Sequence, residues 1–365
     1  MRIAVYGDVN LNLIDGSAIW LAALAEVLAL DAATEVTVVL KAPITRELVV
    51  APLLERDNVT LVADPAGRAR LSPTQALDAL EALDATARFD VVLLRGFALC
   101  QEAARRPALA GRLWTYLTDI PQQAHLADEA TRAALGRIAT ASQRVLCQTD
   151  ELRGLLEGLV PEAAWRTALL PPMVPEGFVR EPAPLRAPPK LFYAGKFAPM
   201  WGFLETVAAF QALRSTHPDL ELHVAGDKVH DPPDDPAFAP AVRAALTDTP
   251  GLVWHGAVTR EEVARLLGTC DVALSARHPD MDASLELSTK VLEYGAAGVP
   301  VVLNRNPLHE RLLGPDYPLF IEHLDDLEAV LGRVLGDPAG WVAAQRTVHE
   351  LAQGYTFPRV RQRLA

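Results

Sequence analysis

Short apolar runs alternate with helix-like segments along almost the whole chain, and this alternation limits the folds open to it. The runs at residues 3–6 and 91–94 are continuously apolar. Strands that are buried on both faces have this pattern, because the helices between them cover both sides of a parallel sheet. Between such runs, the pattern of Ser72, Pro73 and Gln75 is typical of a capped helix start. The chain is therefore predicted to be an α/β protein with doubly wound, Rossmann-like sheets.

The alternation is interrupted at residues 171–189, which contain seven prolines. Proline lacks a backbone donor and has a fixed φ, so this segment is predicted to be a semi-rigid linker. A chain of 365 residues is also too long for one ordinary core. We therefore expect an N-terminal domain at 1–170 and a C-terminal domain at 190–340, which face each other across a cleft. Residues 341–365 are expected to form a C-terminal helix and tail.

The composition is that of a globular protein in a reducing compartment. Half of the residues are apolar and the net charge is −12, which argues against a nucleic-acid binder. The three cysteines, Cys100, Cys147 and Cys270, follow no disulfide or zinc spacing. No signal peptide pattern is present, and no apolar run reaches the roughly 18–20 residues that span a bilayer. We expect a cytoplasmic protein without a metal; a peripheral membrane contact is compatible with the sequence.

One stretch, residues 280–300, combines the features of an anion site. A loop rich in acids and hydroxyls runs into a helical pattern at 289–297. The first backbone N–H groups of a helix have no partner inside it, so they can bind an anion. Glu293 lies one turn along the same helix face. The start of the helix carries two hydroxyls and one ammonium: Ser288, Thr289 and Lys290. A diphosphate at this position, with a hydroxyl-bearing ring beside Glu293, fits the arrangement.

The same stretch resembles the donor-binding segment of retaining glycosyltransferases with the two-domain GT-B fold, the family 4 type. In that family two glutamates are separated by seven residues; the second binds the ribose of a nucleotide sugar and the first binds the transferred sugar. Glu293 matches the second glutamate. Leu285 stands at the position of the first, and Glu286 leaves a gap of six. The resemblance implies that Glu293 contacts the ribose and Glu286 the transferred sugar.

The resemblance extends to the first strand of the second half. Gly195 and Lys196 follow the run at 191–194, where the family has Gly-Arg and, a few residues later, Lys-Gly. Lys196 would therefore grip the diphosphate as a point charge. Trp201 stands at the position of the second cation, where it either packs against the protein or stacks on a ligand.

Two loops of the first half complete the expected site. A glycine-containing loop follows the first strand, and the resemblance implies that Gly16 approaches the donor, with Asn10, Asn12 and Asp15 as sugar or acceptor contacts. Many family members also have a histidine where Thr118 stands here. The adjacent Asp119 either orients a sugar hydroxyl and accepts the acceptor's proton, or caps a turn.

The resemblance implies a glycosyltransferase that moves a sugar from a nucleotide sugar to an acceptor hydroxyl with retention of configuration. It implies no cofactor and no metal, an acceptor side in the N-terminal domain and a donor side in the C-terminal domain, and a final helix that returns to the N-terminal domain. The acceptor is a glycan, a lipid-linked sugar or a small molecule. Two alternatives stay open: a non-catalytic partner or scaffold of an active transferase, and a nucleotide-sugar epimerase. The departures at Leu285, Thr118 and Trp201 favour the first alternative.

Overall fold

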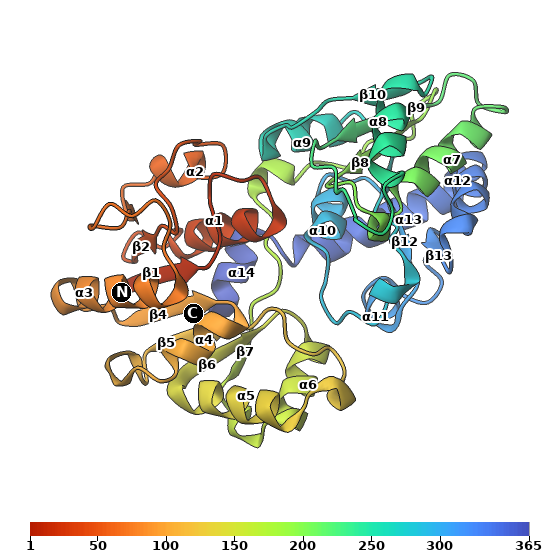
Figure 1. Ribbon diagram of the computed structural model, residues 1–365. Helices are drawn as coiled ribbons and strands as arrows, with labels where there is room; N and C mark the ends of the chain where they lie inside the picture. Colours follow the sequence, from red (N-terminus) through yellow and green to blue (C-terminus); the bar gives the residue numbers. More distant parts are fainter. Residues whose placement is uncertain (365) are drawn as a thin grey trace. The chain divides into compact units, whose positions relative to one another are not determined.

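The computed structural model describes residues 1–364, which form two compact units (Figure 1). The first unit comprises Met1–Met173, Leu285–Leu287 and the residues from Phe357 onward. The second unit comprises Val174–Ser284 and Ser288–Thr356. The chain therefore passes between the two units four times.

A parallel sheet of seven strands forms the centre of the first unit. Its strands are β1 (Arg2–Gly7), β2 (Glu35–Val39), β3 (Val59–Val62), β4 (Val91–Arg95), β5 (Leu113–Tyr116), β6 (Ser142–Cys147) and β7 (Thr167–Leu169). They lie in the order β3-β2-β1-β4-β5-β6-β7, with Ile3 beside Val36 on β2 and beside Val91 on β4. The strand order therefore reverses between β1 and β4.

Helices cover both faces of this sheet, as Figure 1 shows. They are α1 (Gly16–Leu28), α2 (Ala51–Leu54), α3 (Pro73–Ala87), α4 (Phe97–Ala103), α5 (Glu129–Ala141), α6 (Asp150–Leu159) and α14 (Phe357–Leu364). Ile3 and Val5 belong to a core that includes α1, α2 and α14, whereas Ala4 and Tyr6 belong to a second core with α3 to α6. Successive residues of β1 thus point to opposite buried faces, which explains its continuously apolar sequence.

The second unit repeats this architecture with a parallel sheet of six strands. The strands are β8 (Lys190–Ala194), β9 (Glu221–Ala225), β10 (Leu252–Trp254), β11 (Val272–Leu274), β12 (Val301–Asn304) and β13 (Phe320–Ile321). The helices are α7 (Phe203–Leu213), α8 (Phe238–Asp248), α9 (Arg260–Leu267), α10 (Thr289–Ala296), α11 (Pro307–Leu313), α12 (Leu327–Gly336) and α13 (Pro338–Gln353). The strand order is β10-β9-β8-β11-β12-β13, so it reverses between β8 and β11. The doubly wound fold predicted for each half is confirmed.

Local sequence signals set the helix starts. Ser72 accepts a hydrogen bond from the backbone N–H of Gln75, and the Gln75 side chain accepts one from the backbone N–H of Ser72, so the predicted capping box at α3 is confirmed. Thr259 caps α9 with its hydroxyl, which accepts a hydrogen bond from the Glu262 N–H at 3.2 Å. In the described part of the chain, every helix is too short or too polar to cross a membrane.

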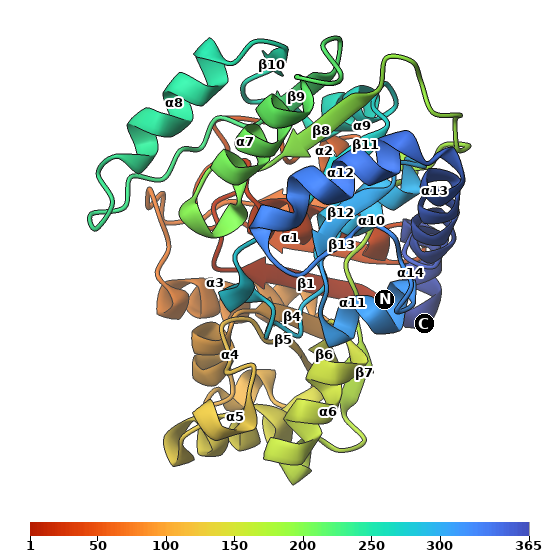
Figure 2. The same cartoon turned by 90° about the vertical axis from the view of Figure 1, so that its right-hand side faces the viewer.

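Helix α13 packs directly on α10 (Figures 1 and 2). Gly295 of α10 faces the backbone of Val348, and a Cβ at this position would overlap the Val348 carbonyl group. The His349 ring nitrogen Nδ1 lies 3.1 Å from the Gly295 carbonyl oxygen. Because no side chain separates the two backbones, α13 fixes the position of the helix that carries Lys290 and Glu293.

The expected linker and C-terminal segment are both divided between the units. Of residues 171–189, those from Val174 onward belong to the second unit, where Arg186 donates to the buried Asp271 carboxylate at 2.9 Å. Most of this proline-rich segment is therefore part of the second unit rather than a free connection. Of residues 341–365, those in α13 stay with the second unit, and the residues from Phe357 onward return to the first.

The contact at Gly295 gives a stability prediction. Gly295→Ala is expected to destabilise the second unit by about 1–3 kcal/mol, the usual cost of overpacking, because the methyl group overlaps the Val348 carbonyl. Gly154→Ala in α6 is the matched control: no atom lies within 4 Å of an added Cβ, so alanine should stabilise the helix by about 0.5–1 kcal/mol. Thermal and denaturant unfolding of both variants measure the difference. Equal effects would contradict the close packing of α10 on α13.

Candidate functional site

Each sheet has one point where its strand order reverses, and ligands of open α/β sheets bind outside the carboxyl ends of the strands at such points. In the first unit this point lies between β1, which ends at Gly7, and β4, which ends at Arg95. In the second unit it lies between β8, which precedes Gly195 and Lys196, and β11. These two places are where a site is expected in each unit.

Two lysines and one tryptophan meet at the reversal point of the second unit. The Lys196 ammonium lies 5.2 Å from the centroid of the Trp201 ring, and the Lys290 ammonium lies 5.3 Å from the same ring. Lys290 is also 5.7 Å from the ring of Tyr193 on β8. An aromatic face attracts cations at such distances. Trp201 therefore contacts two ammonium groups. This contact was not among the two roles expected for Trp201, which were packing against the protein and stacking on a ligand.

The backbone beside these lysines leaves no spare room. Gly195 has φ +150°, and a Cβ there would overlap the Lys290 ammonium. Gly226 after β9 has φ +136°, and a Cβ there would overlap the Gly195 carbonyl oxygen. Only glycine adopts these conformations without strain. The two glycines thus allow the Lys290 side chain to reach the end of β8.

The Lys290 ammonium is energetically costly in the free protein. Burial lowers its pKa to about 8; the Glu293 carboxylate opposes this shift, and repulsion from Lys196 and Arg277 adds to it. A bound anion stabilises a cation that has been removed from water and lies near other positive charges. Lys290 and Lys196 are therefore suited to hold a negatively charged ligand group.

The predicted helix start lies beside these lysines. Thr289 is the first residue of α10, and Ser288 precedes it as the cap residue. The Ser288 side chain accepts no hydrogen bond from the helix, so it leaves the first N–H groups of α10 uncapped. The structure thus brings together four of the predicted donor-binding residues, which are Lys196, Ser288, Thr289 and Lys290.

Glu293 lies one turn along α10 and is paired with an arginine that the sequence did not single out. Arg260, the first residue of α9, contacts the Glu293 oxygen Oε1 through Nη2 at 2.6 Å and through Nε at 2.8 Å. The Arg260 guanidinium also lies 5.6 Å from the centroid of the Phe178 ring. Both contacts to Glu293 fall on one oxygen, so the second carboxylate oxygen is not engaged by Arg260.

Glu286 lies in a different unit from Glu293, because Leu285–Leu287 belong to the first unit. Three side chains of the first unit bind the backbone of this tripeptide. The Leu285 N–H donates to Gln122 Oε1 at 3.1 Å, the Leu287 N–H donates to Gln148 Oε1 at 2.6 Å, and the Thr149 hydroxyl donates to the Leu285 carbonyl at 2.7 Å.

The leucine at 285 has a packing reason. Its side chain packs against the core formed with α3 to α6. A carboxylate at this position would be partly buried among apolar groups, which is costly. The shift from the family's glutamate position to Glu286 is therefore consistent with the docking of this tripeptide.

Around Glu286, the first unit contains an aromatic and polar cluster. The Tyr116 hydroxyl at the end of β5 accepts a hydrogen bond from Gln148 Nε2 at 3.2 Å. Burial raises the pKa of Tyr116, and the Glu286 charge adds to that rise, whereas Arg95 opposes it. The Tyr116 ring lies 4.1 Å from the Trp20 ring, centroid to centroid. Glu286 and Arg95 thus act on the same tyrosine.

The other predicted residues of the first unit have simpler surroundings. Gly16 is the exposed first residue of α1, and a Cβ there would meet no protein atom within 4 Å. Asp15 caps α1 by accepting from the N–H groups of Ser17 and Ala18. Asn12 binds the backbone of Thr45 and Arg46. Asp15 and Asn12, which the resemblance placed against a sugar or an acceptor, are therefore engaged in holding their own loop.

Asp119 follows β5 and is exposed, with φ +62°. Its carboxylate accepts a hydrogen bond from the neighbouring Thr118 hydroxyl at 3.1 Å. This left-handed conformation is one that aspartate tolerates better than most residues. The geometry shows Asp119 near the end of the strand, where the sequence placed it, with a carboxylate open to solvent.

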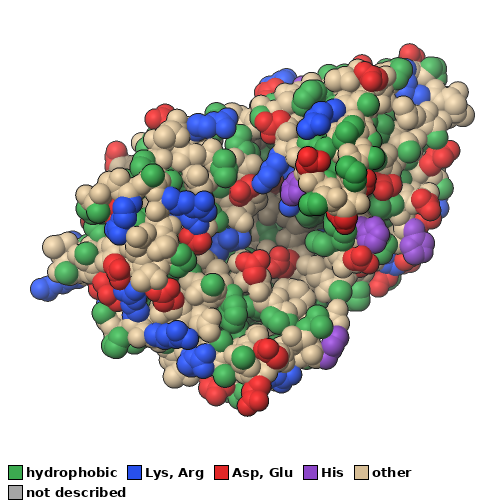
Figure 3. Space-filling model, viewed as in Figure 1, with side chains coloured by type: hydrophobic (Ala, Val, Ile, Leu, Met, Phe, Trp, Pro, Cys, Tyr) green, Lys and Arg blue, Asp and Glu red, His purple; other side chains and the backbone are tan. Residues whose placement is uncertain are grey.

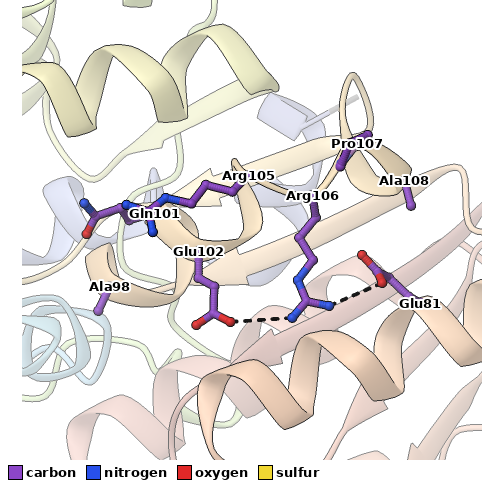
Figure 4. A pocket seen from close by; sticks show the side chains of 8 residues that line it. All are labelled: Glu81, Ala98, Gln101, Glu102, Arg105, Arg106, Pro107 and Ala108. Atoms are coloured by element: carbon purple, nitrogen blue, oxygen red, sulfur yellow. Dashed lines mark hydrogen bonds and ion pairs between the residues drawn. The ribbon is translucent and has the colours of Figure 1, made fainter.

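A pocket of about 700 Å³ lies on the helical layer of the first unit, away from the strand ends (Figure 4). It is lined by Glu81, Ala98, Gln101, Glu102, Arg105, Arg106, Pro107 and Ala108. The Arg106 guanidinium is paired with Asp78 at 2.6 Å and with Glu81 at 3.3 Å. Its charge is already neutralised by these carboxylates, and Arg105, the other arginine of the lining, is exposed to solvent.

Charged side chains of both signs are mixed over the part of each unit that Figure 3 shows, with no broad basic face. Within residues 1–364, no three side chains of the metal-binding types gather as a metal-binding group. The cations at the strand-order reversals are single side chains: Lys196 lies just after β8, and Arg95 lies at the end of β4.

Comparisons with known proteins agree with this geometry. Residues 188–335 match the family model of glycosyl transferases group 1; the match lies almost wholly in the second unit and covers less than half of the chain. Sucrose-phosphate synthase from Thermosynechococcus elongatus has a similar structure, with a TM-score of 0.73, 15% identity, and coverage of 100% of this chain and 96% of that one. The chain has the GT-B fold.

Two further GT-B structures show the same similarity. HepE from Anabaena, in complex with UDP, has a TM-score of 0.72 and 12% identity, with 100% of this chain and 98% of that chain covered. WaaG, a glycosyltransferase involved in lipopolysaccharide biosynthesis, has a TM-score of 0.65 and 13% identity, with the same coverage. No significant match to a curated protein sequence is found. The predicted resemblance to GT-B glycosyltransferases of the family 4 type is confirmed.

The lowered pKa of Lys290 gives a prediction for the ligand-free GT-B protein. Lys290→Met is expected to stabilise the second unit at pH 7, because it removes a costly buried charge. Between pH 8 and the ordinary pKa of 10.5, the unfolded chain binds more protons at this lysine than the folded chain, so wild-type stability rises with pH. The free energy of unfolding of Lys290→Met should therefore exceed that of the wild type by its full amount below about pH 8, and this difference should shrink towards pH 10.

Denaturant unfolding from pH 7 to pH 10 tests this. Lys190→Met is the matched control, because Lys190 lies at the other end of β8 and pairs with Glu221 at 2.7 Å. That variant is expected to lose a small amount of stability. A Lys290→Met variant that is less stable than wild type at pH 7 would show that the ammonium is not a costly group.

Proposed function

We propose that this protein is a glycosyltransferase that moves a sugar from a nucleotide-sugar donor to an acceptor hydroxyl with retention of configuration. The observation that carries the proposal is the meeting of the Lys196 and Lys290 ammonium groups on Trp201. It occurs at the strand-order reversal of the unit that matches the group 1 glycosyl transferases. A local pair of cations in a chain of net charge −12 fits the diphosphate of a nucleotide sugar.

The leaving diphosphate gains negative charge as the glycosidic bond breaks. Lys196, Lys290 and the uncapped N–H groups at the start of α10, beside Ser288 and Thr289, are proposed to stabilise that charge. Donors fixed before the reaction stabilise developing charge without reorganising. Lys290 supplies the second cation that the sequence pattern lacked at Trp201, so the substitution does not remove the positive charge from the site.

Glu293 is proposed to bind the ribose of the donor. One of its oxygens accepts from Arg260, which holds the carboxylate in place and leaves the second oxygen for a ribose hydroxyl. Glu286 is proposed to contact the transferred sugar, Gly16 to allow close approach of the donor, and Asp119 to orient a hydroxyl or accept its proton. The first unit is the proposed acceptor side and the second the donor side.

Several similar structures support a nucleotide-sugar donor. HepE has been solved with UDP-glucose, and an Escherichia coli protein described as trehalose-6-phosphate has been solved with UDP-2-fluoro glucose. UDP-sugars are therefore the first donors to test. We propose no cofactor and no metal, a cytoplasmic location, and an acceptor that is a glycan, a lipid-linked sugar or a small molecule.

A non-catalytic partner of an active transferase is a second candidate. The specific observation in its favour is the Thr118 and Asp119 pair, which stands where many members of the resembling family have a histidine. Such a protein would bind nucleotide yet form no product.

Binding of nucleoside diphosphates and nucleotide sugars tests the donor site. Lys196→Gln and Lys290→Gln are each expected to weaken this binding by about tenfold or more, since each removes a charge-assisted contact of roughly 1.5–3 kcal/mol. Lys190→Gln, at the opposite end of β8, is the matched control and should bind as the wild type does. Calorimetry and thermal shift measure the effect. Absence of binding by every nucleotide in the panel would overturn the donor assignment.

Product analysis separates the candidate activities. With a UDP-sugar that binds and a panel of acceptors, the expected outcome is a glycoside with the donor's anomeric configuration, seen by nuclear magnetic resonance, together with released UDP. Glu286→Gln is expected to lower the rate more than it lowers nucleotide affinity, because Glu286 is proposed to touch the sugar. Inversion would contradict retention. A mass-neutral product without acceptor would indicate an epimerase, and nucleotide binding without any product would indicate the non-catalytic partner.

A further inference from the structure

We propose that the first unit contains an oxyanion-binding subsite, built on Arg95, Ser17 and Trp20, which takes a phosphate or carboxylate group of the acceptor. The assignment of the anion to an acceptor rests on the proposed function. The subsite itself rests on the contacts of the first unit alone.

The position of Arg95 is the first observation. It is the last residue of β4, beside Gly7 on β1 and Tyr116 on β5. This is the strand-order reversal of the first unit, where ligands of such sheets bind. The Arg95 guanidinium lies 5.5 Å from the centroid of the Trp20 ring, and its Nη2 donates to the Ser17 hydroxyl at 3.0 Å.

Unpaired donors are the second observation. Trp20 is only 8% exposed, and its Nε1 hydrogen has no acceptor among the described residues. The Arg95 Nε is likewise buried without an acceptor in the described chain. Buried donors in native proteins are almost always paired, so two orphans on side chains in contact indicate a missing acceptor. The Ser17 hydroxyl accepts from Arg95, which leaves its own hydrogen to donate.

The charge of Arg95 is the third observation. Two other cations of this unit, one buried and one half-buried, each have a carboxylate at close range: Lys41 with Asp8 at 2.5 Å, and Arg112 with Asp84 at 2.7 Å. Arg95 has no such ion pair within the described residues. The Asp15 carboxylate, which precedes α1, instead accepts hydrogen bonds from the backbone N–H groups of Ser17 and Ala18. A cation without a partner in a half-buried place favours an anionic ligand.

Access is the fourth observation. Gly16 precedes Ser17 at the start of α1, is exposed, and has no protein atom within 4 Å of where a Cβ would lie. A ligand can therefore reach the Ser17 hydroxyl along the side of Gly16. Because Lys196 and Lys290 of the second unit are assigned to the donor diphosphate, the anion bound at Arg95 belongs to the second substrate.

Inorganic phosphate is the first probe, with the full chain and sodium chloride at equal ionic strength as reference. Phosphate can also bind at Lys290, so four proteins are compared: wild type, Arg95→Gln, Lys290→Gln and the double variant. In the Lys290→Gln background, Arg95→Gln is expected to weaken phosphate binding by about tenfold, the loss of one charge-assisted contact. Arg95→Lys should retain most of the affinity because it keeps the charge. Arg105→Gln, an exposed arginine on the helical layer, is the matched control and should change nothing.

Hexose 6-phosphates, hexuronates and neutral hexoses identify the source of the anion. Tighter binding of hexose 6-phosphates than of neutral hexoses, lost in Arg95→Gln, supports a phosphorylated acceptor; the same result with hexuronates supports a carboxylated one. Arg95→Gln that leaves all anion binding unchanged while remaining folded by circular dichroism would overturn the subsite. If Arg95→Gln does not fold, Ser17→Ala provides the same test.

Failure of the proposed function is distinguishable from failure of the subsite. Loss of nucleotide binding with intact Arg95-dependent phosphate binding would refute the donor assignment and leave the subsite standing. Normal nucleotide binding with phosphate binding that ignores Arg95 would refute the subsite alone.

Discussion

A parallel sheet that is covered by helices on both faces can meet a ligand only at the ends of its strands. In this protein the two separate cores on either face of β1 show this for the first sheet, and the fully buried strands β11 and β12 indicate it for the second. Burial of the strands therefore does more than stabilise each unit, because it determines where function can lie. At each point where the strand order reverses, a cation lies at the carboxyl end of a strand: Arg95 is the last residue of β4, and Lys196 is the second residue after β8. Polar chemistry is thus confined to a small part of a largely apolar framework.

Much of this framework could be predicted from the sequence because its causes are local. Continuous apolar runs predicted buried parallel strands, and the Ser72 pattern predicted the helix start that it caps. Lys196 and Lys290 were each expected to contact a diphosphate, because the first follows a strand and the second lies at a helix start. The rule that ligands bind at strand ends could have found Arg95 as well, since it follows the apolar run at 91–94.

What could not be predicted depends on contacts between residues far apart in sequence. The tripeptide Leu285–Leu287 joins the first unit through side chains of Gln122, Gln148 and Thr149, and no pattern around Glu286 indicates this. The proline-rich segment reads as a linker, yet the ion pair between Arg186 and Asp271 attaches it to the second unit. The pairing of Glu293 with Arg260 has the same origin, since α9 and α10 meet only in the folded chain.

The four passages of the chain between the units have a consequence for how such proteins can exchange parts. The first unit is completed by α14, whose Phe357, Val360 and Leu364 belong to the core with α1, and by the tripeptide at 285–287. A gene fragment that ends near residue 173 would therefore encode a first unit without α14 and without the tripeptide. The apolar residues that α14 covers would be exposed, and the side chains of Gln122 and Gln148 would lose their hydrogen-bond partners. Recombination that exchanges the second unit between relatives must transplant Val174–Ser284 and Ser288–Thr356 together, and it must keep the last helix and the tripeptide matched to the first unit.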